Sequence, residues 1–194
     1  ETVPIGESIT AVVGPMIENY YMYVTPSIYK PGALKAFKLG GNSNFGASTD
    51  VGFGFKYEAD NGFAIASNIV DKNADSTGFF QNDSVSKWDT QFAYTQPRYH
   101  LSLTLSNAQN WTSQLYNATA LGENTATDSM GYAARAYWMP EETGTAVPEI
   151  SVGYDVKVWD DAANGAVDEA ASWMIGLTWK DIMSADDRIG IALS

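Results

Sequence analysis

Apolar residues recur at every second position over much of this chain, and this period of two constrains the fold more than any other feature. At residues 150–158, apolar side chains alternate with Ser, Gly, Asp and Lys, and residues 51–57 and 173–179 repeat the pattern. Successive side chains of a β-strand point to opposite faces, whereas a helix repeats about every 3.6 residues. The pattern therefore predicts strands with one apolar face and one polar or small-residue face.

The same pattern predicts about nine strands and gives no convincing helix. The predicted strands are residues 8–16, 51–57, 63–70, 88–94, 99–103, 130–138, 150–158, 173–179 and 189–193.

The predicted connections alternate between short and long. Residues 59–62 form a tight turn in which Asn61-Gly62 suits a type I′ hairpin. Longer polar segments span residues 18–48, 71–85 and 106–128. Short turns on one side and long loops on the other are typical of outer-membrane barrels. The predicted fold class is therefore all-β, an antiparallel up-and-down transmembrane β-barrel to which this chain contributes about nine strands.

The composition agrees with strands that have two unlike faces. Aromatic residues make up 13% of the chain and charged residues 18%, where about a quarter is usual for charged residues in a soluble domain. The mean hydropathy is nevertheless −0.19. No apolar run reaches the roughly 18 residues that a membrane helix needs. A barrel wall with an apolar outside and a polar inside has this balance.

The segment 172–180 shows both predicted faces. We predict that one face contacts lipid, through Trp173, Ile175, Leu177 and Trp179. The two tryptophans would lie about 20 Å apart along the strand, which approaches the height of the apolar band between the aromatic girdles of a barrel. A core-facing strand of a soluble sandwich, with both tryptophans buried, is the alternative.

Charged and polar residues on the opposite faces are the candidates for lining a water-filled pore. These candidate pore-lining residues are Lys56, Asp89, His100, Arg135, Asp155, Lys157 and Thr178. The alternative is the solvated outer face of a soluble sheet, and the sequence does not separate the two.

Several classes of function lack the residues that they need. The net charge of −12 argues against nucleic acid as a partner. The chain has no cysteine and one histidine, which makes a metal site or a Ser-His-Asp triad a poor expectation. Adjacent acidic pairs such as Glu141-Glu142 are poor glycosidase dyads, since neighbours on a strand point apart. We therefore expect no enzyme activity, no catalytic residue, no metal and no cofactor.

Three segments carry a family resemblance. Residues 134–144 read Ala-Arg-Ala-Tyr-Trp-Met-Pro-Glu-Glu-Thr-Gly, and residues 147–155 continue with Val-Pro-Glu-Ile-Ser-Val-Gly-Tyr-Asp. Residues 171–181 end in Gly-Leu-Thr-Trp-Lys-Asp, and residues 9–15 end in Val-Gly-Pro. In this order they resemble the cyanobacterial outer-membrane porins of the carbohydrate-selective (OprB-type) family, also called iron uptake porins.

The resemblance implies a passive channel in the cell outer membrane for inorganic ions and small solutes, carbohydrates included. Its partners would be outer-membrane lipid and a possible homo-oligomer such as a trimer. Family members are longer, with a signal peptide, an SLH domain that binds the cell wall, and further strands. We therefore expect this chain to be an internal piece of the barrel, with no cell-wall binding of its own.

Other expectations stay open at this point. A soluble secreted all-β carbohydrate-binding module is the alternative function, and an all-β hydrolase is a weaker third. If the chain is a porin, residues 18–48 would lie on the extracellular side and could fold inward to narrow the pore. The excess of acidic residues in the connections predicts a weak cation preference.

Overall fold

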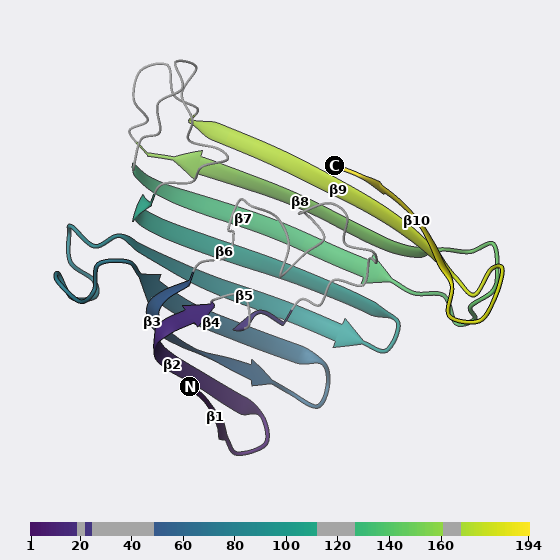
Figure 1. Cartoon of the computed structure of the whole chain (residues 1–194), viewed down its shortest axis with the longest axis horizontal. Helices are drawn as coiled ribbons and strands as arrows, with labels where there is room; N and C mark the ends of the chain where they lie inside the picture. The colour runs from purple at the N-terminus through teal and green to yellow at the C-terminus, as the bar shows by residue number, and fades with distance from the viewer. Residues whose placement is uncertain (19–21, 25–48, 112–126, 161–167) are drawn as a thin grey trace.

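The computed structural model describes residues 1–18, 22–24, 49–111, 127–160 and 168–194. The described residues form ten β-strands and no α-helix (Figure 1). The strands are β1 (Thr2–Ile5), β2 (Ile9–Glu18), β3 (Thr49–Glu58), β4 (Phe63–Asp71), β5 (Ser86–Gln96), β6 (Tyr99–Trp111), β7 (Thr127–Trp138), β8 (Glu149–Trp159), β9 (Glu169–Lys180) and β10 (Arg188–Leu193).

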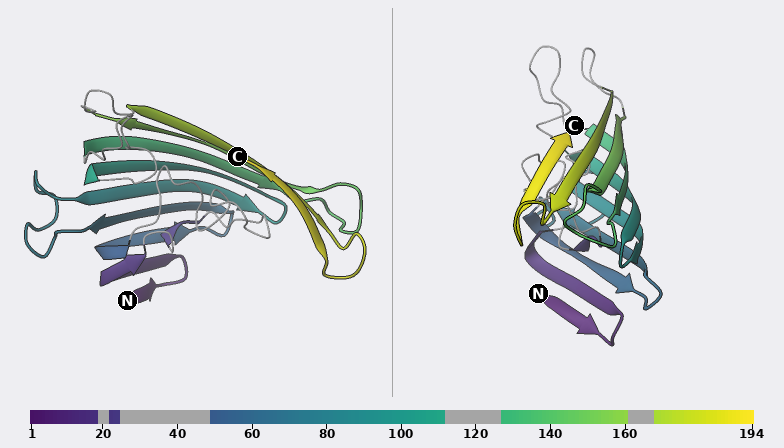
Figure 2. Two further views of the ribbon diagram at one scale, coloured as in Figure 1. Left: turned by 45° about the horizontal axis from the view of Figure 1, so that its top comes forward. Right: turned by 90° about the vertical axis from the view of Figure 1, so that its right-hand side faces the viewer.

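Each strand pairs antiparallel with its neighbours in sequence, so all ten form one up-and-down sheet in the order β1 to β10. This confirms the predicted all-β, antiparallel, up-and-down architecture. In the described residues the sheet is not closed into a barrel, because β1 and β10 each pair on one side only. Figure 2 shows the sheet curling, so that the β1–β2 and β9–β10 edges bend to the same side of the central strands.

The up-and-down order sends alternate connections to opposite rims of the sheet (Figure 1). One rim receives the connections 19–48, 72–85, 112–126 and 160–168; we call it the long-connection rim. The other receives 6–8, 59–62, 97–98, 139–148 and 181–187, and we call it the short-connection rim. The predicted segregation of longer and shorter connections holds in part, because 139–148, with ten residues, is longer than 160–168 on the other rim, with nine.

The strand prediction was wrong at two places. It missed β1, a four-residue edge strand that contains Pro4 and has exposed side chains throughout; a strand so short shows little alternation. It also ended the strand at residue 103, whereas β6 continues to Trp111. Polar residues occupy both faces of β6 beyond Leu105, so the apolar period stops before the strand does.

Two register shifts interrupt the ladders near the long-connection rim. In β2 the shift falls between Gly14 and Ile17. Pro15 lies inside it, where a residue without an N–H is tolerated. In β6 the shift falls between Ala108 and Trp111, and Asn110 there has a φ of 51°. Such bulges bend a strand and increase its twist, in keeping with the curl of the sheet.

The β3–β4 turn is not the predicted type I′ hairpin. The Gly62 N–H donates to the Ala59 carbonyl at 2.9 Å, and Gly62 has a φ of 93°. Neither Asp60 nor Asn61 is among the described residues with positive φ, although a type I′ turn needs positive φ at both central positions. The turn is instead a three-residue loop that ends in a left-handed glycine, the usual G1-bulge hairpin.

We predict that Gly62→Ala destabilises the sheet by more than Gly78→Ala. A Cβ at Gly62 would lie 2.2 Å from the Thr95 carbonyl oxygen, whereas at Gly78, with a φ of 80°, it would meet nothing within 4 Å. Both variants carry the strain of a left-handed alanine, about 1–3 kcal/mol, and only Gly62→Ala adds the clash. Denaturant unfolding followed by tryptophan fluorescence measures both. Equal losses of stability would contradict the close approach at Gly62.

Candidate functional site

Strand pairing brings the predicted polar positions onto one face of the sheet, which we call the polar face. One row of paired residues runs Asn68, Asp89, Ser106, Gly131 and Lys157 from β4 to β8. The same parity places all seven candidate pore-lining residues on this face. Six are buried, and the Lys56 side chain is partly exposed. The six are Asp89, His100, Arg135, Asp155, Lys157 and Thr178.

The opposite face, which we call the apolar face, is exposed. Trp173 and Ile175 are 49% and 41% exposed, whereas Leu177 and Trp179 are half-buried. All four lie on this face, opposite Thr178. Other exposed apolar residues extend it across the sheet: Val3, Ile5, Ile9, Val13, Phe53, Phe55, Tyr57, Phe63, Trp88, Phe92, Tyr99, Leu101, Leu103, Tyr132, Trp138, Val152, Tyr154, Val158, Ile189, Ile191 and Leu193. A soluble sheet exposes the other polarity.

The apolar face also carries a groove of about 410 Å³. It lies where the small side chains of Ala134 and Ala136 are flanked by Leu101, Tyr154 and Trp173. An apolar surface this continuous on a soluble protein usually marks a binding surface for protein or membrane.

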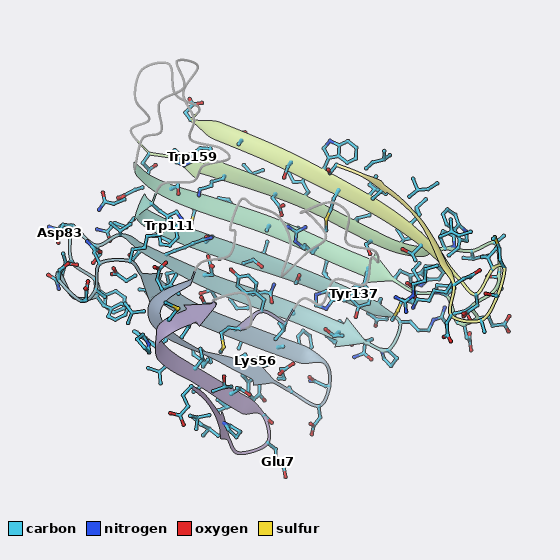
Figure 3. All side chains as sticks on the ribbon, viewed as in Figure 1. Glu7, Lys56, Asp83, Trp111, Tyr137 and Trp159 are labelled. Atoms are coloured by element: carbon cyan, nitrogen blue, oxygen red, sulfur yellow. The ribbon has the colours of Figure 1, made fainter. Side chains whose placement is uncertain are left out.

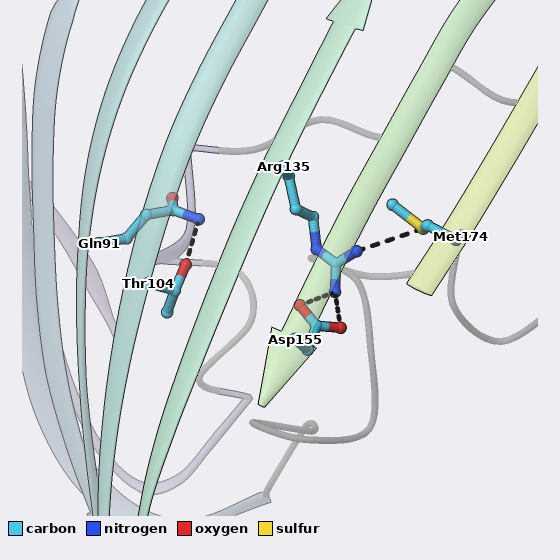
Figure 4. Close-up of polar contacts among 5 residues, drawn as sticks. All are labelled: Gln91, Thr104, Arg135, Asp155 and Met174. Atoms are coloured by element: carbon cyan, nitrogen blue, oxygen red, sulfur yellow. Dashed lines mark hydrogen bonds and ion pairs between the residues drawn. The ribbon is translucent and has the colours of Figure 1, made fainter. Parts of the chain in front are cut away.

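Arg135 and Asp155 form the best-defined ion pair of the polar face (Figure 4). One guanidinium nitrogen of Arg135 donates to both carboxylate oxygens of Asp155, at 2.9 and 3.1 Å, and the other lies 3.2 Å from the sulfur of Met174. The guanidinium fits here because residue 153 is a glycine. A Cβ atom at this position would lie 2.5 Å from a guanidinium nitrogen of Arg135. The alternation of the sequence predicts that both charges lie on this face, but it does not predict that they pair.

A second polar cluster centres on Asp89. Lys87 lies 4.0 Å from its carboxylate, and the Tyr23 hydroxyl donates to the same group. Beside it, the Val24 N–H donates to the Gln91 side chain at 2.7 Å, and Gln91 donates to Thr104 at 3.0 Å (Figure 4).

These contacts bring residues 22–24 onto the polar face. Residues 22–24 of the segment 18–48 therefore lie against the polar face, and the narrowing of a pore by this segment stays a prediction. Residues 19–21 and 25–48 of that segment lie outside the described residues. Lys87 was not among the predicted site residues, because the strand predicted here begins one residue later, at Trp88.

His100 lies near the short-connection rim without a metal-binding arrangement. Its ring stacks on Tyr137, with centroids 5.2 Å apart and planes at 9°, and its Nδ1 lies 2.7 Å from the Thr95 hydroxyl. No group of three or more His, Asp or Glu among the described residues could hold a metal ion. His100 is therefore a buried member of the polar face.

Further polar and aromatic residues lie at the two rims of the sheet. At the long-connection rim, β6 ends at Trp111 and β8 ends at Trp159 (Figure 3). Near the short-connection rim, Lys180 pairs with Glu149, which the sequence analysis did not predict. In the turn that follows β9, hydrogen bonds from the Thr143 side chain and the Asp186 backbone hold the pKa of Asp181 below its usual value. Asp181 is therefore a carboxylate at neutral pH and fixes this turn.

A scan against protein-family models and a search of curated proteins found no match to this chain. The family resemblance of the sequence therefore stays a prediction. Across the stretches of chain that the structure describes, no helix is long and apolar enough to cross a membrane.

We predict that Arg135→Met destabilises the folded chain by about 3–5 kcal/mol, because it leaves the Asp155 carboxylate buried without its partner. The double variant Arg135→Met with Asp155→Leu removes both charges, and such apolar replacement of a buried pair is often nearly neutral. Denaturant unfolding of the two single variants and the double variant forms a thermodynamic cycle. Additive losses would show that the two side chains do not interact.

Proposed function

We propose that this chain is part of the wall of an outer-membrane β-barrel porin, a channel for passive diffusion of inorganic ions and small solutes. The observation that carries the proposal is the inverted polarity of the sheet: its charged and hydroxyl side chains are buried and its aromatic and aliphatic side chains are exposed. Lipid is the solvent that suits such an apolar surface, and a water-filled lumen suits the other face.

The backbone supports the same proposal. In a bilayer every N–H and C=O group must be hydrogen-bonded within the protein, which leaves helices and closed barrels as the structures that span it. The eight interior strands pair on both sides, and the outer sides of β1 and β10 are unpaired in the described residues. In the proposed barrel, these two edges pair with each other or with further strands, and the curl of the sheet brings both to one side (Figure 2).

The polar face supplies the features of a pore wall. Its side chains are hydroxyls, amides and charges of both signs, such as Thr104, Gln91, Arg135 and Asp89. Tyr23 and Val24 bind to this wall, so part of the β2–β3 connection occupies the lumen of the proposed barrel. An inserted segment narrows the passage and favours small solutes over large ones.

We predict that Ile175→Arg costs about 2–4 kcal/mol in lipid, as arginine does at the midplane of a barrel's outer face. Ile182→Arg is the matched control, because Ile182 is 39% exposed, close to the 41% of Ile175, but lies in the β9–β10 turn. Its cost should be near zero. Unfolding in phospholipid vesicles measures both. Equal small costs would show that the apolar face meets water, as in a soluble carbohydrate-binding module.

We also predict that the protein forms discrete, ohmic channels in planar lipid bilayers. In the proposed barrel the polar face forms the wall of the pore, and passive pores conduct in proportion to voltage without an energy source. Single-channel recording in KCl tests this directly, and heat-denatured protein is the control. Bilayers that stay sealed after stable insertion of the folded protein would exclude the porin proposal.

A further inference from the structure

Four aromatic side chains form a cluster at the long-connection rim, on the side of the apolar face. Phe53 of β3 and Trp88 of β5 belong to that face and are 43% and 51% exposed. Phe79 and Phe80 come from the β4–β5 connection, residues 72–85, which projects past the ends of the strands (Figure 1). The ring centroids of Phe53 and Phe79 are 5.4 Å apart. Those of Phe80 and Trp88 are 6.1 Å apart. These four residues, which we call the rim cluster, extend the apolar face beyond the strands.

Phe80 is both exposed and strained. Its side chain is 61% exposed, and its φ of 62° lies in the left-handed region, which a bulky side chain rarely adopts. Strained residues of this kind occur preferentially where a function requires them. Contact of a large apolar ring with water is itself unfavourable. A strained backbone that holds such a ring in the open therefore indicates a neighbour other than water.

Hydrogen bonds fix the connection that carries these rings. The Asn73 side chain donates to the Asp83 carbonyl at 3.0 Å and accepts from the Val85 N–H at 2.7 Å, which closes the connection at its base. The hydroxyl of the buried Ser84 donates to the Gly78 carbonyl at 3.0 Å. The two phenylalanines are therefore held in place by an ordered loop.

We propose that the β4–β5 connection is a membrane anchor that inserts Phe79 and Phe80 into the interfacial layer of a phospholipid bilayer. The rim cluster is continuous with the apolar face, and that face meets lipid in the proposed barrel, so the anchor rests on the proposed porin function. Aromatic residues are enriched at both interfaces of outer-membrane barrels. In this chain a connection adds two such residues to those of the strands.

Size and charge favour lipid over a second copy of the chain as the partner. The rim cluster exposes about 400 Å² of ring surface, given the usual area of aromatic side chains, whereas a stable protein interface buries about 800 Å² on each partner. The connection carries two acids, Asp75 and Asp83, and one base, Lys72. Lys72 lies over the Trp111 ring, 3.9 Å from its centroid. The connection therefore does not attract anionic headgroups, and a bilayer without net charge is the expected partner.

The test places a fluorophore in the connection, and a single site can be labelled because the chain has no cysteine. Phe80→Cys, labelled with an environment-sensitive dye, is reconstituted as the full chain in phosphatidylcholine vesicles. Lipids that carry a nitroxide on the acyl chain should quench the dye. Iodide should quench it at least about threefold less than at the control position, because a bilayer excludes ions. Asn82→Cys is the matched control, since Asn82 is exposed in the same connection and its carbonyl accepts from Gln109 of β6 at 2.9 Å.

Phe79→Cys is the second reporter if Phe80→Cys does not fold, and far-UV circular dichroism shows which variants are folded. Equal iodide quenching of the reporter and of the Asn82→Cys control would overturn the anchor. A reporter that neither iodide nor the nitroxide lipids quench would indicate that a second copy of the chain covers the rim cluster, and this result would also overturn the anchor.

Ile175→Cys separates the anchor from the porin function, because Ile175 lies on the apolar face within β9. Quenching by nitroxide lipids at both Ile175→Cys and the reporter is the expected result. Lipid quenching at Ile175→Cys alone would leave the porin wall standing and overturn the anchor. Lipid quenching at the reporter alone would support the anchor and overturn the porin wall.

Discussion

The physical constraint on which this structure depends is the pairing of each strand with its neighbours in sequence. Once the strands are paired, the backbone N–H and C=O groups of the interior strands are hydrogen-bonded to neighbouring strands. The side chains alone then determine which solvent each face contacts. Because the alternation keeps its parity across the sheet except at the register shifts near the ends of β2 and β6, one choice of face holds over most of β1 to β10. A slip of one residue in any strand would send charges to the apolar face.

The polar face buries charged side chains, and burying a charge is costly unless a partner compensates it. Arginine and lysine are accommodated by small neighbours: Gly153 gives space to Arg135, and Gly131 separates Lys157 from Ser106. The Arg135–Asp155 and Lys180–Glu149 pairs each join two strands, whereas Lys87 and Asp89 both belong to β5. Arg135 links β7 to β8 through Asp155 and approaches Met174 of β9. Such a network favours one register over its alternatives.

The sequence was sufficient to predict the strand type, the order of short and long connections, and the face of each candidate residue, because all three follow from the period of two. It was not sufficient to predict which residues the charged side chains of the polar face contact. Arg135 lies opposite Gly153 and meets Asp155 diagonally, and a diagonal contact depends on register, which alternation alone does not fix. The Tyr23 to Asp89 contact joins residues 66 positions apart, with no local signal. Likewise β1 was too short, and the end of β6 too polar on both faces, to show a period.

The position of a charge matters more than the total. Acidic residues such as Asp75, Asp83, Asp160 and Asp186 are exposed in the connections, where water and salt screen them over about 8–10 Å. Lys87, Arg135 and Lys157 lie buried on the polar face, as do the carboxylates of Asp89, Glu149 and Asp155, and screening is weak there. The exposed acids therefore act weakly on their surroundings, whereas each buried charge acts strongly on the groups beside it. The net charge of −12 therefore does not describe the polar face, where the described residues bury three bases and three carboxylates.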